Sequence, residues 1–522
     1  MSTTPQTTTI KHAPGSQPWI QEILSPEVLV FLKELHENFE PSRQKLLESR
    51  LAVQQRMDSG VKFEFPERTA HVRSAEWKIS PIPDCLRDRR LELLVLPNEE
   101  SLKAGTTSKA SVLIADFEDG ISPTWANLLN GQRALCQWVT HSSAGNNHSV
   151  LMIRPRAMHC DESHVTVNNE LLSASLFDFG LYFFHNAHQL VEQGQGPFFY
   201  LSKLEHYREA RWWNDIFIFA QNYFGLDCGT IKATVTVETM PAAFQLDEML
   251  YELRDHSSGL SCGKQNYLFS FIKHFGTKAG YILPDRDALS FQCPFLECYA
   301  QQIVYVAHRR GGQAIGVTSN ELPNGKNEAL SDGIMETVIK GKMDEQTQGF
   351  DGSRVAHPQL VAPILKHWNS AKPETNNERP LNVQHIGVNQ LLSVSRGDIT
   401  ERQIRQHIHV CLFYLASWLS GAGTIEIMQK VEDKTGAELA RAQLWQWKQC
   451  KARLADGQVF DLALFNNLFD EESMKVRSML SAKPEVNKYL ATASELLLHL
   501  VHEKSQTSFI TDLAYPLLVN RN

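Results

Sequence analysis

Short apolar segments alternate with helical stretches between about residues 90 and 360. Continuous apolar strands separated by helices are typical of a parallel sheet that is covered on both faces. About eight such units in this length fit a (β/α)8 barrel, which usually takes roughly 250 residues. The predicted strands are residues 91–96, 111–115, 149–153, 197–201, 231–237, 280–283, 314–317 and 355–357. The sequence therefore predicts an α/β protein built on a TIM barrel.

The segments on either side of this barrel are predominantly helical. Ser25 and Pro26 suit the start of a helix, and apolar residues recur at helical spacing as far as Met57. After Thr400, a capping residue, the pattern is helical almost to the end. We expect a disordered arm at residues 1–18, an N-terminal helical domain at 19–90, the barrel at 91–360, a polar linker at 361–389 and a C-terminal helical domain at 390–522.

Composition argues against several classes of protein. A net charge of -8, without a cluster of lysine and arginine, argues against a nucleic-acid partner. No apolar stretch is long enough to span a bilayer, and the polar first residues predict no secretory signal. Nine scattered cysteines without a Cys-x-x-Cys pair favour reduced thiols, so we expect a cytoplasmic protein. No feature of the sequence fixes the oligomeric state.

Polar residues gather where the predicted strands end, which is where TIM barrels carry their active sites. Asp116, Glu118 and Asp119 follow one strand, Arg154 ends the next, and Glu238 ends a later one. Three acids so close together repel one another, so they need a cation, protonation or water. The alternatives to an active site here are that the acids lie in a solvated loop and that Arg154 forms a structural ion pair.

Glu238 and Asn266 are separated by the distance expected between one strand end and the next. A carboxylate and a second oxygen ligand suffice for Mg²⁺, which keeps several waters. Between them, Gly259 and Gly263 suit a close approach of the backbone to a ligand. Asp433 lies in a helical stretch, and a solvated helix charge is its alternative reading.

Several long motifs occur in one order along the chain. They are Asp116-Phe-Glu-Asp119 with Ser122-Pro-Thr-Trp125, the segment 200–215, the segment 247–257, Leu283-Pro-Asp-Arg286, Val355-Ala-His-Pro358 and Ala442-Gln-Leu-Trp-Gln-Trp447. Together they resemble malate synthase, isoform A, from about residue 20 to Tyr515. The resemblance implies a TIM barrel with an N-terminal helical clasp and a C-terminal helical plug. It also implies condensation of acetyl-CoA with glyoxylate and hydrolysis to malate and CoA.

The resemblance also implies roles for particular residues. Asp433 matches the base that deprotonates the thioester methyl group, and Arg154 matches the cation that stabilises the enolate. Glu238 and Asn266 match the ligands of Mg²⁺, which polarises the glyoxylate aldehyde. The substrate-binding positions are Gly263, Gln265, Asp116 and Glu118.

This chain departs from the family pattern at three places. Asn266 stands where the family has a metal-binding acid, in Gly-Lys-Gln-Asn-Tyr rather than Gly-Arg-Trp-Asp-Tyr. Ala157-Met158 replaces Gly-Trp, and Val317-Thr318 replaces Gly-Met. The leading expectation is an active enzyme of a glyoxylate bypass. The alternatives are a paralogue that condenses another 2-oxo acid or acyl-CoA, and an inactive relative that binds CoA or a protein partner.

Overall fold

The computed structural model describes residues 8–10, 18–142, 149–323, 328–368, 386–506 and 509–519. Eight strands close into a barrel in the order β10-β11-β2-β3-β4-β7-β8-β9, and every neighbouring pair is parallel. They are β2 Leu91–Val95, β3 Val112–Asp116, β4 Val150–Arg154, β7 Phe198–Leu201, β8 Lys232–Val237, β9 Ser257–Cys262, β10 Gln313–Ser319 and β11 Gly352–Val355. The predicted TIM barrel is confirmed.

The sixth barrel strand is not the one that the sequence predicts. Residues 280–283 were expected to form a strand, but they overlap a 3-10 helix at Ala279–Tyr281. The strand is β9, whose serines and glycine give a poor apolar signal although every residue is buried. Inside the barrel, Ser258 Oγ lies 2.8 Å from Thr234 Oγ1 of β8. The last predicted strand, 355–357, lies slightly beyond the observed β11.

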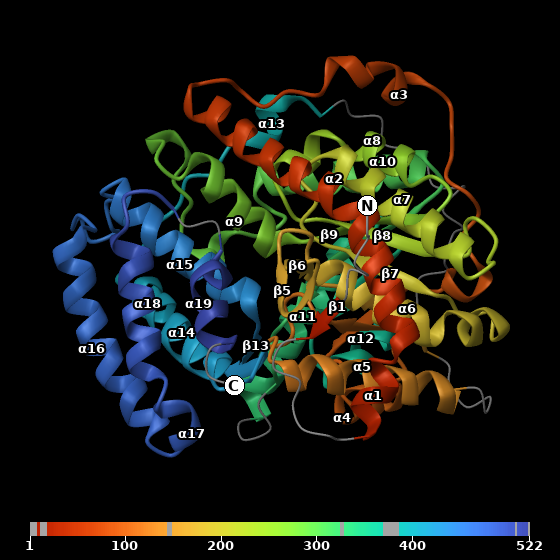
Figure 1. The fold of residues 1–522 in the computed structure, drawn as a ribbon. Coiled ribbons are helices and arrows are strands. Elements are labelled where there is room, and N and C mark those ends of the chain that lie inside the picture. The colour runs from red at the N-terminus through yellow and green to blue at the C-terminus, as the bar shows by residue number, and fades with distance from the viewer. Residues whose placement is uncertain are drawn as a thin grey trace, which may run out of the picture.

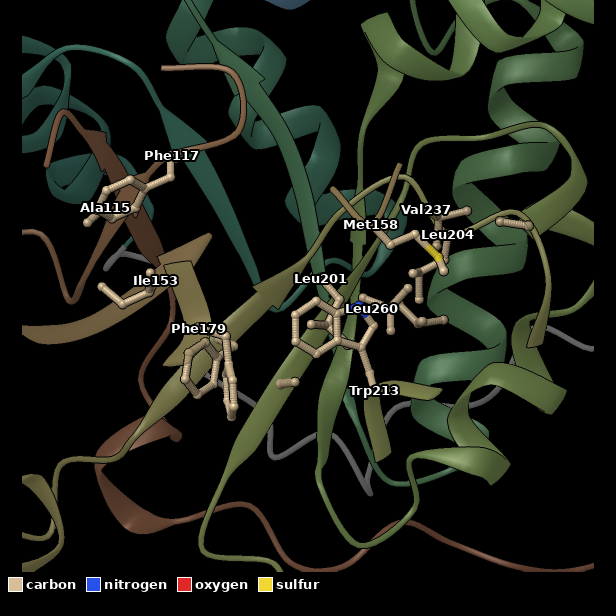
Figure 2. Packing of buried hydrophobic residues seen from close by; sticks show 14 of the residues in the cluster. Ala115, Phe117, Ile153, Met158, Phe179, Leu201, Leu204, Trp213, Val237 and Leu260 are labelled. Atoms are coloured by element: carbon tan, nitrogen blue, oxygen red, sulfur yellow. The ribbon is translucent and has the colours of Figure 1, made fainter. Parts of the chain in front are cut away.

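Helices surround the barrel and bury its outer face (Figure 1). They are α4 Glu99–Ser108, α5 Trp125–Ser142, α6 Ala174–Glu192, α7 Tyr207–Tyr223, α8 Leu246–Glu252, α9 Lys264–Phe275, α10 Pro294–Arg309, α11 Glu328–Gln348 and α12 Val361–Trp368. Their apolar faces and the strands form one core cluster. Figure 2 shows part of this cluster, with Phe179 of α6, Leu201 of β7 and Trp213 of α7 among its members.

The N-terminal segment is helical, and its longest helix lies along the outside of the barrel. It comprises α1 Pro18–Ile23, α2 Pro26–Asp58 and, further on, α3 Ala70–Ser74. Ser25 caps α2 by accepting a hydrogen bond from the Val28 amide, and Pro26 occupies the first turn, as predicted. Helix α2 packs against α6 and α7, where Phe31 meets the edge of Phe224 at 5.3 Å between ring centroids. This helix therefore covers barrel helices that would otherwise expose apolar surface.

A group of helices at one side of the barrel forms the C-terminal domain, drawn in blue in Figure 1. Its elements are α14 Glu401–Leu419, α15 Lys434–Gln449, α16 Leu462–Leu480, α17 Pro484–Asn487, α18 Leu490–His502, α19 Ile510–Val519 and the hairpin β12 Ile425–Ile427 with β13 Lys430–Glu432. These helices have a hydrophobic core of their own. Helix α15 packs against α9 of the barrel, so the start of α15 lies at the barrel mouth.

Two of the expected irregular segments contain regular structure. Thr8–Ile10, inside the arm predicted to be disordered, forms β1 and pairs antiparallel with β5 Asp161–Val167, which also pairs with β6 Glu170–Ser173. The predicted linker at 361–389 begins with α12 and ends within α13 Val388–Leu392. Residues 369–385 of that linker lie outside the described part of the chain. The arm prediction was therefore wrong at Thr8–Ile10, where backbone pairing orders the strand.

Candidate active site

The polar residues that the sequence singles out meet at the carboxyl ends of the barrel strands. Asp116 ends β3 and Arg154 ends β4, and these two residues are register partners in neighbouring strands. Glu238 directly follows β8, and Gly263 joins β9 to α9. Because parallel strands end at one edge of the barrel, residues far apart in sequence become neighbours there.

Arg154 is the centre of a buried ion cluster. Its guanidinium lies 3.2 Å from Asp116 Oδ2, 2.8 Å from Asp119 Oδ2 and 3.0 Å from Glu238 Oε2. Its Nε donates a hydrogen bond to Ser202 Oγ at 2.7 Å. Burial alone would lower the pKa of Arg154, but the surrounding carboxylates hold it well above its usual value. The guanidinium is therefore permanently charged and fixed in orientation.

Two lysines neutralise the acids that follow β3. Lys203 Nζ contacts Glu118 and lies 2.8 Å from Asp119 Oδ1. Lys434 Nζ, from the C-terminal domain, lies 2.9 Å from Glu118 Oε1. Burial would raise the pKa of Glu118, but the two lysines keep it well below its usual value. Of the three predicted possibilities, a cation, protonation or water, the structure shows cations beside these acids: Lys203, Lys434 and Arg154.

Asp433 is held at the first turn of α15, where it acts as the N-cap. Its Oδ1 accepts hydrogen bonds from the Thr435 amide at 2.9 Å and from the Gly436 amide at 3.3 Å. Burial, with the nearby charge of Asp119, raises the pKa of Asp433 to about 7. A carboxylate with such a pKa accepts a proton more readily than an ordinary aspartate near neutral pH.

Hydrogen bonds also connect the first turn of α15 to the barrel. Thr435 Oγ1 lies 2.6 Å from Asp433 Oδ1 and 2.6 Å from Gln265 Oε1 at the start of α9. In addition, the Lys434 amide donates to the Asp119 carbonyl at 3.3 Å. The carboxylate of Asp433 is thus positioned by contacts that cross from the C-terminal domain to the barrel.

Glu238 and Asn266 form a pair of oxygen-bearing side chains beside Arg154. Asn266 Nδ2 donates a hydrogen bond to Glu238 Oε2 at 2.7 Å, while Asn266 Oδ1 is buried and has no hydrogen-bond partner among the described residues. No group of three or more histidines, cysteines or acids in the described ranges is arranged to hold a metal ion. Magnesium needs only one or two protein oxygens, because waters and substrate complete its shell. The unpartnered amide oxygen beside a carboxylate fits that ion.

One cavity of about 410 Å³ joins these groups. Six of the predicted site residues line it: Arg154, Glu238, Gly263, Gln265, Asn266 and Asp433. Asp116 and Glu118 are not among its lining residues, and their side chains are engaged by Arg154 and by the two lysines. Their predicted contact with substrate stays a prediction.

The departures from the family pattern fall in two different environments. Val317 and Thr318 line the cavity. Met158 does not; it is fully buried in the core cluster that also holds Leu204 and Val237 (Figure 2). Of these replacements, those at Val317 and Thr318 change the wall of the cavity, and the one at Met158 does not.

Gly259 was also expected to approach a ligand, but it is not among the residues that line the cavity. A Cβ at Gly259 would lie 2.0 Å from the Gln313 carbonyl oxygen of β10, so glycine is needed for strand packing. A Cβ at Gly263 would lie 2.4 Å from Glu238 Cβ, so glycine is needed there for the backbone to lie against Glu238, and the predicted approach of Gly263 to a ligand stays a prediction.

Four cations of the site had no role assigned from sequence: Lys203, Lys434, Lys264 and Arg354. Lys203 follows β7 in the position where strand ends carry function, so a signal for it existed. Lys434 is adjacent to Asp433 and could have been found from that neighbour. Lys264 and Arg354 gave no signal, because their surroundings depend on the closed barrel.

A cavity at the carboxyl ends of the strands, lined in part by the first turn of a helix from another domain, places the chain among TIM-barrel enzymes with acid–base chemistry at the barrel mouth. Comparison of the sequence with models of known families identifies which of these enzymes the chain is related to. The family models for malate synthase match in three segments: the N-terminal domain at residues 16–71, the TIM barrel domain at 150–394 and the C-terminal segment at 398–518. The chain therefore belongs to the malate synthase family.

Individual relatives agree over nearly the full length. Malate synthase of Myxococcus xanthus (strain DK1622) is 38% identical over 511 residues, covering 95% of this chain and 94% of the relative. Malate synthase A of Escherichia coli (strain K12) is 35% identical over 532 residues, covering 99% and 100%. A solved Haloferax volcanii malate synthase magnesium/glyoxylate complex aligns at 12% identity with a TM-score of 0.42, over 79% of this chain and 98% of that chain. That likeness is too distant to inform the side chains of this site.

The described helices include none that is long and apolar enough to cross a membrane.

Proposed function

We propose that this chain condenses acetyl-CoA with glyoxylate and hydrolyses the product thioester to malate and CoA. The observation that carries the proposal is that Asp433, from the C-terminal domain, and Arg154, from β4, line one cavity. A methyl group next to a thioester is a very weak acid. Its deprotonation needs both a positioned base and a cation for the oxygen that becomes negative. Relatives that carry the name malate synthase support the same reaction.

Asp433 takes a proton from the methyl carbon of acetyl-CoA. Its pKa of about 7 leaves a large deprotonated fraction at neutral pH, together with a real affinity for the proton. Its hydrogen bonds to the Thr435 and Gly436 amides fix the carboxylate at the helix start. The nucleophilic methylene carbon then forms a bond to the aldehyde carbon of glyoxylate.

Arg154 stabilises the enolate oxygen that forms when the proton leaves. Three carboxylates and Ser202 fix its planar guanidinium, so little reorganisation is needed as charge develops. In this proposal Asp116 and Glu118 act through other residues: Asp116 orients Arg154, and Glu118 holds Lys434 beside the base.

Glu238 and Asn266 would hold Mg²⁺. The carboxylate supplies charge, and the buried Oδ1 of Asn266, which has no partner in the described structure, supplies a neutral ligand. Bound magnesium would act as a Lewis acid on the aldehyde of glyoxylate.

The start of α9 would bind the carboxylate of glyoxylate. Gly263 is the N-cap of this helix and has no side chain that could cap it, so the first-turn amides near Gln265 have no N-cap acceptor among the described residues. The positive end of a helix favours an anion there. Gln265 contributes a further polar side chain, already fixed by Thr435.

We also propose that the enzyme works in the cytosol. All nine cysteines are free, as suits a reducing compartment. Fractionation of cells that express the tagged chain tests this proposal, and recovery in a sealed organelle would contradict it.

The experiment for the proposed reaction is release of the free CoA thiol from acetyl-CoA, with and without glyoxylate and with and without Mg²⁺. We expect release that depends on both additions. A protein that is folded by circular dichroism and releases no CoA with glyoxylate and Mg²⁺ would contradict the proposal.

A further inference from the structure

Two cations that line the cavity, Arg354 and Lys264, have no carboxylate within 4.0 Å among the described residues. Arg354 lies on β11 and is only 4% exposed. Lys264 lies in the first turn of α9. Both line the same cavity as Asp433 and Arg154.

Arg354 reaches across the inside of the barrel. Its Nη2 donates to the Cys262 carbonyl at the end of β9, and its Nε donates to the Gly316 carbonyl of β10 at 3.4 Å. Its guanidinium also lies 5.7 Å from the centre of the Tyr200 ring. Carbonyls and a ring face solvate a cation but leave its charge unbalanced. A buried cation without a counter-charge is costly, so an anion that enters here is favoured.

Lys264 is in a comparable state. Its Nζ donates to the Leu289 carbonyl at 3.1 Å, and Glu321 of the cavity wall acts on it only from beyond ion-pair distance. Lys342, on the nearby helix α11, shows the contrast: its Nζ lies 3.1 Å from Glu345 Oε1 and 2.8 Å from Ser353 Oγ. Of these three cations, only Lys342 is neutralised by the protein itself.

The proposed function assigns the one carboxylate of glyoxylate to the first-turn amides of α9 and gives no role to the side-chain charges of Lys264 and Arg354. Glyoxylate is also small: the cavity holds about 410 Å³, whereas one water takes only about 30 Å³ of liquid. Lys264 and Arg354 line this cavity together with Arg154 and Asp433.

We propose that the chain also condenses acetyl-CoA with a 2-oxo acid that carries a second carboxylate, and that Lys264 and Arg354 bind this distal carboxylate. This inference rests on the proposed chemistry of Asp433 and Arg154. The methyl carbon loses a proton to Asp433 and bonds to the keto carbon, whose oxygen takes up a proton. One water then cleaves the thioester, which yields a hydroxy tricarboxylic acid and the CoA thiol without any oxidant or reductant.

The phosphates of CoA are the other anions that could meet these cations. Arg354 is a poor partner for them, because it is buried inside the barrel and bound to the end of β9. The fork of a guanidinium matches carboxylate and phosphate alike, so it is the buried position of Arg354 that favours the more compact carboxylate. Calorimetry with CoA alone separates the two sources.

The first test compares second substrates in the CoA-release assay with acetyl-CoA and Mg²⁺. The probes are glyoxylate, oxaloacetate, 2-oxoglutarate and 2-oxopentanoate, which has the carbon chain of 2-oxoglutarate with a methyl group in place of the distal carboxylate. We expect at least one diacid to be turned over with a kcat/KM about 10- to 100-fold above that of 2-oxopentanoate, the usual range for a charge-assisted hydrogen bond.

The second test measures binding of 2-oxoglutarate and of CoA to variants by calorimetry. We expect Arg354→Met and Lys264→Met each to raise the Kd of 2-oxoglutarate about 10- to 100-fold and to leave that of CoA within about twofold. Lys340→Met is the matched control, since Lys340 is an exposed lysine at the same cavity and loses the same charge. Arg354→Lys serves if Arg354→Met does not fold.

The outcomes separate this inference from the proposed function. Turnover of glyoxylate without turnover or binding of either diacid would overturn the inference and leave the proposed function standing. Diacid binding that depends on Arg354 and Lys264, without CoA release from any 2-oxo acid, would support the subsite and contradict the proposed function. A variant that weakens CoA rather than 2-oxoglutarate would assign the cations to phosphate and overturn the inference.

Discussion

The two sides of the barrel mouth differ in whether their charged side chains have partners of opposite charge. On the side of β3, β4 and β7, each acid has a cation from the protein: Asp116, Glu118 and Asp119 meet Arg154, Lys203 and Lys434. On the side of β9, β10 and β11, Lys264 and Arg354 donate hydrogen bonds to carbonyl groups and have no carboxylate within 4.0 Å among the described residues. The first side is complete without a ligand and can position catalytic groups. The second side leaves charge that a ligand can balance.

The largest expected effect comes from the base on the balanced side. Asp433→Asn removes the proton acceptor but keeps an N-cap, because asparagine caps helices about as well as aspartate. We expect kcat to fall about 10²- to 10⁴-fold without a change in Tm. Steady-state CoA release and thermal unfolding measure the two quantities.

Asp461→Asn is the control for that variant. Asp461 caps α16 with φ -118 and ψ -177, close to the φ -117 and ψ -170 of Asp433, and it does not line the cavity. Its replacement should leave turnover unchanged. An Asp433→Asn enzyme with most of its rate would rule out Asp433 as the base.

The next prediction concerns how much Arg154 stabilises the fold by neutralising the acids around it. Arg154→Met leaves Asp116, Asp119 and Glu238 without their shared counter-charge, so we expect a loss of about 3–5 kcal/mol in the free energy of unfolding, besides loss of turnover. Urea unfolding measures it. Arg402→Met, which breaks an exposed pair with Asp287, should cost less than about 1 kcal/mol. Equal losses of unfolding free energy in the two variants would show that the buried cluster contributes no more to stability than an exposed ion pair.

A smaller effect concerns the metal site between the two sides. Asn266→Asp adds a negative charge next to Glu238, so we expect Mg²⁺ to bind about tenfold more tightly, or about 1.4 kcal/mol. Calorimetry with Mg²⁺ alone measures the change independently of activity. Asn466→Asp, on α16 and outside the cavity, is the control. Equal affinity in wild type and Asn266→Asp would contradict the assignment of Asn266 as a ligand.

The mildest test changes only pH. Asp433 must be deprotonated to act, so kcat should fall as pH falls through the pKa of about 7. Between pH 6 and pH 8 the deprotonated fraction changes about tenfold for such a pKa, and kcat should follow it. Asp119→Asn removes one of the charges that raise this pKa and should move the midpoint to lower pH. A rate that is flat over this range would contradict the raised pKa.

The barrel was predictable because most of its strands are apolar runs. Strands β2, β3, β4, β7 and β8 fall within one or two residues of their predicted positions. Strand β9 was missed because its serines are polar although they are buried; the hydroxyl of Ser258, for example, is satisfied by Thr234 of the neighbouring β8. A polar residue that is satisfied by its tertiary neighbours cannot be recognised from local hydrophobicity.

The site was predictable only where residue types and positions carried a signal. Arg154 and Glu238 stand at strand ends, and the malate synthase motifs pointed to Asp433. The balance of charge was not predictable, since it depends on which side chains meet when the barrel closes. Arg354 belongs to β11 in sequence but bonds to the end of β9, and only the closed ring of strands brings these together.

The most direct test of the central claim follows the carbon–carbon bond itself. Acetyl-CoA labelled with ¹³C at the methyl carbon is incubated with glyoxylate, Mg²⁺ and enzyme, and the product is observed by NMR. We predict that the labelled methyl signal is replaced by the methylene signal of malate with the wild type and that it persists with Asp433→Asn. Free CoA together with labelled acetate, and no labelled malate, would show simple thioester hydrolysis and contradict the account.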